Sequence, residues 1–153
     1  MRQDMSRPET TPDPVRKEVL GLLARAPSER LAQLLPELPE HDLLRAPEIG
    51  AVMVRGRAGG TGAPFNLGEK TVTRASIRLP SGEVGHGYVQ GRDKGHALRA
   101  ALIDAMTQQD TAGIEARILA PLRDEEAARR KAIATEAAAT RVEFFTLVRG
   151  EDE

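Results

Sequence analysis

The segment EKTVTRASIRLPSGEVGHGYVQGR, residues 69–92, indicates the fold most clearly. Apolar or small residues alternate with polar ones from Thr73 to Leu79, and this period of two predicts a half-buried strand. Residues 80–82, Pro-Ser-Gly, are typical of a tight turn, and residues 83–92 alternate again. We therefore predict a long antiparallel hairpin over residues 69–92. Glycines inside its second strand indicate either close approach of another backbone or bulges.

Upstream of this hairpin, an apolar strand passes into a glycine-rich loop at residues 53–62, MVRGRAGGTG. Residues 49–55 are apolar at both alternating sets of positions, which is typical of a strand buried on both faces. Leu43 and Leu44 indicate a further short strand that ends near Pro47. Together these segments predict a mainly antiparallel sheet of about four strands.

Helical signals precede the sheet. Asp13 followed by Pro14 is typical of an N-cap and a first helical position. Apolar residues then recur at spacings of three and four to about Ala26. Ser28 is expected to begin a second helix, which Pro36 ends. The sequence predicts an N-terminal helical hairpin that packs its leucines in the core.

Helical signals also follow the sheet. Asp93 is a good N-cap for the next helix. Residues 110–120 predict a shorter helical piece that ends before Pro121, and residues 124–147 are rich in strong helix formers. The predicted fold class is α+β, with an N-terminal helical hairpin, the antiparallel sheet, and C-terminal helices packed on it.

The bulk properties limit the classes of protein. The chain has 153 residues, a net charge of −1 and no cysteine. We expect one domain over residues 13–153, preceded by a disordered arm over residues 1–12. The charge lacks the basic excess expected for nucleic-acid binding, and no apolar run is long enough for a membrane span. Without a thiol the chain cannot ligate an iron–sulfur cluster. These features, and an N-terminus without a signal-peptide core, favour a cytoplasmic protein.

Positive charge gathers near glycine in this sequence. A loop such as residues 56–62 can turn backbone N–H groups towards an anion, with neighbouring arginines as charge-assisted donors. We predict an anion-binding or substrate-binding surface made by Arg55, Arg57, Gly59, Gly60, Thr61, Gly62, Arg74 and Arg92. The alternatives are a flexible hairpin connection and a solvated basic face.

Other chemistry is weakly indicated. His86, His96 and Asp93 could meet near one turn as a metal site, but a histidine on a strand is more often simply hydrogen-bonded. We therefore predict no metal site, and we assign no catalytic residue, because no nucleophile or metalloprotease motif occurs.

The C-terminus is unusually apolar for a chain end. Phe144, Phe145, Leu147 and Val148 lie within the last ten residues, in a chain with three phenylalanines and one tyrosine. An apolar end of this density is expected to dock on a surface, either its own sheet or another chain. We expect these four residues to form a partner interface.

Several segments resemble the PhnG family, the small subunit of the bacterial carbon–phosphorus lyase system for phosphonate breakdown. The similar segments are residues 59–62 (GGTG), 73–79 (TRASIRL), 91–97 (GRDKGHA), 101–106 (ALIDAM) and 141–150 (RVEFFTLVRG). The resemblance runs in order from about Val15 to the C-terminus and does not cover the N-terminal arm.

The resemblance implies a function. PhnG-like subunits assemble with PhnH, PhnI and PhnJ, and PhnL is needed for activity. In the first step an alkylphosphonate displaces adenine from MgATP to give a ribose 1-alkylphosphonate 5-triphosphate. The resemblance implies that the catalytic centre lies mainly in PhnI, that this chain is an accessory subunit without a cofactor of its own, and that MgATP is a substrate of the complex.

An alternative from another class of function is a stand-alone binding module for a phosphorylated metabolite. The two hypotheses differ at the C-terminus, because a free module has no need for an apolar, aromatic chain end.

Overall fold

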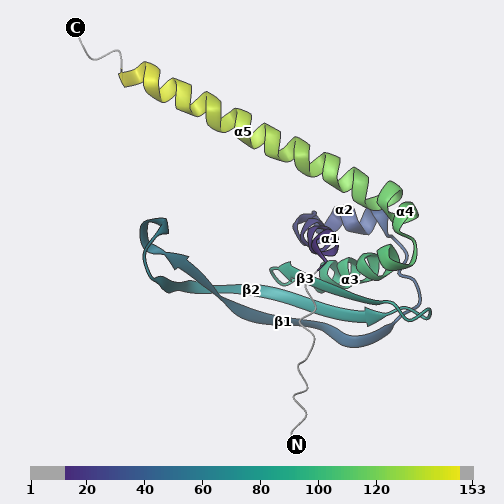
Figure 1. Cartoon of the computed structure of the whole chain (residues 1–153). Helices are drawn as coiled ribbons and strands as arrows, with labels where there is room; N and C mark the ends of the chain where they lie inside the picture. The colour runs from purple at the N-terminus through teal and green to yellow at the C-terminus, as the bar shows by residue number, and fades with distance from the viewer. Residues whose placement is uncertain (1–12, 149–153) are drawn as a thin grey trace, which may run out of the picture.

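A computed structural model describes residues 13–148, with side chains described as far as residue 141. Its centre is a three-stranded antiparallel sheet in the order β1 (Asp42–Arg57), β2 (Pro64–Arg78) and β3 (Val84–Gln90). Helices lie on one side of this sheet (Figure 1). The predicted α+β class is confirmed, although the sheet has three strands and not about four.

The N-terminal helical hairpin is confirmed. Its helices are α1 (Pro14–Arg25) and α2 (Ser28–Leu34). The Asp13 carboxylate accepts a hydrogen bond of 3.0 Å from the backbone N–H of Val15, as expected of an N-cap. Leucines and a valine from both helices are buried in the core: Val19, Leu22, Leu23 and Leu31.

The two strands predicted around residues 43–44 and 49–55 are one strand, β1. Irregular pairing between Leu43 and Glu48 accommodates Pro47, which has no N–H to donate. The prediction that residues 49–55 are buried on both faces is wrong. The side chains of Ile49 and Met53 are 41% and 52% exposed. The reason is that α3, which covers one face of the sheet, packs mainly on β3 and β2 and contacts β1 little.

Helix α3 (Lys94–Gln109) packs closely on β3. A Cβ atom on Gly85 or Gly87 would lie 1.9 Å from the carbonyl oxygen of Ala101 or Ala97, respectively. Only glycine permits this approach, which confirms close backbone contact as the role of these two glycines. Asp93 accepts a 2.9 Å hydrogen bond from the backbone N–H of His96, so it is the predicted N-cap of α3.

The chain then forms α4 (Thr111–Ile114), a π-helical turn (Glu115–Leu119) and α5 (Ala120–Val148). The predicted helix end before Pro121 is wrong, because this proline is the second residue of α5. The π-helical turn changes the hydrogen-bonding ladder just before the proline, and a proline near a helix start is tolerated.

Over the residues whose side chains the structure describes, helix α5 contacts the rest of the molecule at its base. Leu122 is buried, Glu126 pairs with Arg25 at 2.6 Å, and Glu125 pairs with Arg30 at 2.8 Å. Side chains from residue 127 to residue 141 are exposed. In Figure 1 this rod and the far end of the β1–β2 ribbon project to the same side of the molecule. None of the described helices has the length and apolar character to cross a bilayer.

Candidate functional site

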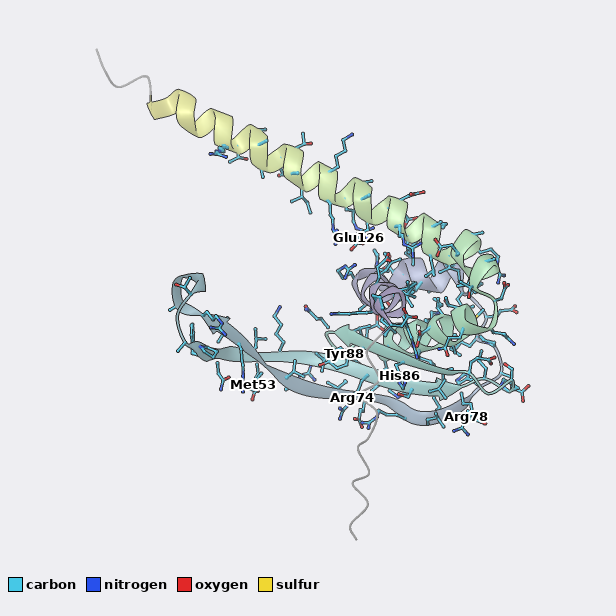
Figure 2. The ribbon with its side chains drawn as sticks, in the orientation of Figure 1. Met53, Arg74, Arg78, His86, Tyr88 and Glu126 are labelled. Carbon is cyan, nitrogen blue, oxygen red and sulfur yellow. The ribbon has the colours of Figure 1, made fainter. Side chains whose placement is uncertain are left out.

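The face of the sheet opposite α3 is open and polar. Alternation along β2 and β3 places Arg74, Ser76 and Arg78 on this face together with His86 and Tyr88. The register sets Arg74 opposite Tyr88 and Ser76 opposite His86. Figure 2 labels Arg74, Arg78, His86 and Tyr88 along the two strands. We refer to these five residues as the outer-face cluster.

Hydrogen bonds organise this cluster and its neighbours. The Glu48 carboxylate accepts from Arg74 at 2.7 Å and from Arg45 at 2.5 Å, and these bonds hold the pKa of Glu48 below its ordinary value. The Ser76 hydroxyl and the His86 Nδ1 atom are 2.8 Å apart. Arg78 forms no ion pair with any described side chain. The face can therefore attract an anion, although the side chains of Arg74 and Glu48 are about half exposed to water.

The glycine-rich loop forms the tip of the β1–β2 ribbon. Gly59 and Gly60 have φ angles of 61° and 78°, in the region that favours glycine. The Arg57 Nη1 atom donates to the Gly62 carbonyl at 3.3 Å, within the loop itself. Arg55 lies one step back, opposite Asn66. The tip is exposed and positively charged, as an anion-binding loop would need to be.

The predicted anion-binding residues fall in three places. Arg55, Arg57 and the loop residues 59–62 share the tip. Arg74 lies in the middle of the sheet, and β2 runs roughly 30 Å from the tip to this residue at about 3.3 Å per residue. Arg92 follows β3 in the connection to α3. Anion binding stays a prediction for each place, but the structure does not combine them into one surface.

An ion pair between a partly exposed arginine and a buried carboxylate, which sequence reasoning missed, joins three elements. Asp104 of α3 is 1% exposed. Its carboxylate accepts from Arg16 Nε at 3.1 Å, from Arg16 Nη2 at 2.8 Å and from the His86 backbone N–H at 2.9 Å. Arg16 Nη2 also donates to the Val84 carbonyl at 3.1 Å.

The hydrogen bond to Asp104 is the largest cause that raises the pKa of Arg16. A surface pocket of about 320 Å³ lies beside this pair. The sequence carried one signal for it, because Asp104 interrupts the apolar run of residues 101–105, and a carboxylate in such a run needs a partner.

The histidines do not form a cluster. His96 is 7% exposed, and its Nε2 atom is 2.9 Å from the Leu23 carbonyl oxygen. His86 lies on the opposite face of the sheet, and Asp93 is occupied as an N-cap. Over the described residues, no three metal-ligating side chains come together. The alternative metal site at His86, His96 and Asp93 is therefore not assembled.

The predicted partner interface of Phe144, Phe145, Leu147 and Val148 lies outside the residues whose side chains the structure describes. The described side chains still place unpartnered apolar groups elsewhere. Leu67 in β2 is 62% exposed, and Ile133 in α5 is also well exposed. Single exposed apolar residues are common on protein surfaces, so these two do not define an interface by themselves.

These features define a small α+β protein with an open polar face, a projecting ribbon and a projecting helix. Residues 14–150 match the family described as phosphonate metabolism protein PhnG, so the chain belongs to the PhnG family. A similar protein is the alpha-D-ribose 1-methylphosphonate 5-triphosphate synthase subunit PhnG of Rhizobium meliloti (strain 1021). It is 50% identical over 145 residues, which cover 90% of each chain. The resemblance found in the sequence is confirmed.

Proposed function

We propose that this chain is a subunit of alpha-D-ribose 1-methylphosphonate 5-triphosphate synthase, in which an alkylphosphonate displaces adenine from MgATP. The observation that carries this proposal is the 50% identity, over nine-tenths of both chains, to a relative that bears this name. The match to the PhnG family over residues 14–150 agrees with it.

Within the complex we assign the chain an accessory role. The outer-face cluster lies on an open surface, whereas active sites that handle reactive intermediates close around their substrate. The ion pair of Arg16 with the buried Asp104 holds α1, α3 and β3 together. We therefore propose that the catalytic centre lies on another subunit, that this chain holds no cofactor of its own, and that MgATP binds to the complex.

The partners we propose are PhnH, PhnI and PhnJ, with PhnL needed for activity, in the cytoplasm. The projecting ribbon and α5 support binding to other subunits. A two-stranded ribbon alone is marginally stable in water, and α5 exposes its described side chains from residue 127 onward. The apolar residues near the end of α5, Phe144 and Phe145 with Leu147 and Val148, remain our proposed interface there.

Assembly tests this proposal. The full chain is co-expressed with PhnH, PhnI and PhnJ from the same source, and the products are separated by size-exclusion chromatography with mass determination. We expect one stoichiometric complex that contains the chain. A chain that elutes alone while the other three assemble without it would overturn the proposed function.

The arginines can be tested within the same complex. Arg57→Ala alters the tip and Arg74→Ala alters the outer face, so the two places can be examined one at a time. If either place holds a phosphate or phosphonate group, its variant is expected to lower the rate of adenine release measured per assembled complex. Unchanged rates of adenine release for both variants would show that neither place binds substrate.

A further inference from the structure

The two edges of the sheet differ in whether their outward backbone groups are already hydrogen-bonded. At the β3 edge, side chains take up the outward backbone groups. Asp104 accepts from the His86 N–H, while Arg16 and Gln108 donate to the Val84 carbonyl at 3.1 Å and 2.8 Å. This edge cannot accept another strand at these positions, because its hydrogen bonds are already made.

At the β1 edge, the register determines which backbone groups point away from the sheet. Backbone bonds from Leu79 N–H to the Glu83 carbonyl and from Gly91 N–H to the Thr71 carbonyl show that odd-numbered residues of β2 bond towards β3. Hydrogen bonding alternates along an antiparallel strand, so even-numbered residues of β2 bond towards β1. These face the even-numbered residues of β1 between Glu48 and Val54. The backbone N–H and C=O groups of Ile49, Ala51 and Met53 therefore point away from the sheet.

Only part of the β1 edge is protected against strand addition. Register shifts and Pro47 interrupt the first half of the strand, and both features are known to block edge-to-edge pairing. From Glu48 to Val54 the register is regular. This regular part is apolar, and Ile49 and Met53 expose about half of their side chains. An open, regular and apolar edge is what an added strand requires.

We propose that residues 49–54 of β1 receive an extended segment of a partner subunit as an additional strand. This inference rests on the proposed function, because it requires the chain to assemble with other subunits. The segment would convert the marginal two-stranded ribbon into three strands. It would also cover the exposed side chains of Ile49 and Met53.

Charge indicates the chemistry of that segment. Between residues 49 and 70 the chain carries Arg55, Arg57 and Lys70 against the single acid Glu69, whereas the whole chain has a net charge of −1. A second copy would bring two positive ribbons together, and like charges disfavour that pairing. We therefore assign the position to an acidic segment with alternating apolar residues, from a different subunit.

Hydrogen exchange tests strand addition directly. The full chain alone and the complex with co-expressed PhnH, PhnI and PhnJ are exchanged, quenched and analysed at single-residue resolution. We expect the amides of Ile49, Ala51 and Met53 to exchange at least about tenfold more slowly in the complex. The amides of Gly50 and Val52 serve as internal controls, because they already bond to β2. Unchanged exchange at the three outward amides would overturn the proposal.

A pair of variants separates the backbone contribution from the side chain. Ala51→Pro removes one outward N–H without breaking a bond to β2, while Ala51→Val keeps the N–H and favours a strand. We expect Ala51→Pro to bind the partner subunits about tenfold more weakly, which corresponds to about 1.4 kcal/mol. Ala51→Val is expected to bind as the unaltered chain does.

Other outcomes are also decisive. If Ala51→Pro fails to fold, as judged by circular dichroism, Met53→Lys introduces a charge at the same edge and is expected to weaken binding. Equal binding by every folded edge variant would overturn strand addition while leaving the proposed function intact. If the isolated chain forms a dimer, and Ala51→Pro makes it monomeric, the edge would be assigned to a second copy instead. Failure of the unaltered chain to assemble would contradict the proposed function itself.

Discussion

At the scale of single residues, the Asp104 carboxylate of α3 links this helix to α1 and β3 through hydrogen bonds. It receives three hydrogen bonds, two from Arg16 and one from the backbone of His86. Burial of a carboxylate is costly unless such partners replace water. The attraction within the pair therefore contributes less to stability than the cost of leaving a buried polar group unpaired when one partner is removed.

Asp104→Ala should destabilise the fold strongly. Removing the carboxylate leaves the Arg16 guanidinium and the His86 N–H without their acceptor. We expect a loss of about 3 kcal/mol in the free energy of unfolding, towards the lower end of the range for broken buried pairs, because Arg16 is partly exposed. Urea denaturation measures it, with the exposed Glu136→Gln as control. A loss no larger than that of the control would show that the pair contributes little.

Gly87→Ala should be among the most damaging small substitutions. Its Cβ atom would meet the Ala97 carbonyl oxygen of α3, so the helix and the strand would have to separate. We expect a cost of about 3 kcal/mol or more in the free energy of unfolding. Gly50→Ala is the matched control, because no atom lies within 4 Å of the added Cβ. Similar urea midpoints for the two variants would contradict the close contact.

At the scale of elements, the local signals in the sequence located the helices well. Asp13 and Asp93 cap the helices they were expected to cap, and the alternation in residues 73–79 identified a half-buried strand. The environment of residues 49–55 could not be predicted, because alternation reports only that both faces are apolar. Whether anything covers those faces depends on which strands the helices pack against, and α3 packs mainly on β3 and β2.

The candidate site was predictable only in part. Glycines at 59 and 60 do form a loop beside Arg57, since their positive φ angles suit a ribbon tip. The sequence could not separate this tip from Arg74, because their distance depends on the length of the ribbon. The Arg16–Asp104 pair joins residues 88 positions apart. The apolar run around Asp104 indicates that this carboxylate needs a partner, but no local pattern identifies Arg16 as that partner.

The cap of α3 gives a pH dependence. Hydrogen bonds from Ser28 and then from the His96 backbone lower the pKa of Asp93. A carboxylate with a lowered folded-state pKa stabilises the protein above its unfolded-state pKa, near 4. That contribution is lost as the pH falls through the folded-state value. When the pH falls from 5 to 3, Asp93→Asn should therefore lose less stability than the unaltered chain, as measured by thermal unfolding. The difference between the two proteins should be on the order of tenths of a kcal/mol, because the group is exposed. An identical acid dependence in both proteins would argue against this role.

At the scale of the whole molecule, the chain is a packed body with two projecting elements, the β1–β2 ribbon and α5 (Figure 1). Both are basic. Residues 127–141 carry three arginines and one lysine against the single acid Glu136. Because the whole chain has a net charge of −1, positive charge is concentrated where the molecule is most exposed. This distribution suits acidic surfaces on partner subunits.

The salt dependence of assembly follows from this distribution. Raising the salt concentration from 0.05 M to 0.5 M should slow association with the partner subunits, because opposite charges are screened beyond a few ångströms at high salt. Association rates from stopped-flow or surface binding measure this effect. An association rate that does not change with salt would indicate that apolar groups alone drive binding.

The central claim is that this chain is a required subunit of the synthase, and the most direct measurement is adenine release. MgATP and methylphosphonate are mixed with PhnH, PhnI and PhnL, with and without the chain, and free adenine is quantified by chromatography. Our account predicts phosphonate-dependent adenine release only when the chain is present. Release at the full rate in its absence would contradict the account.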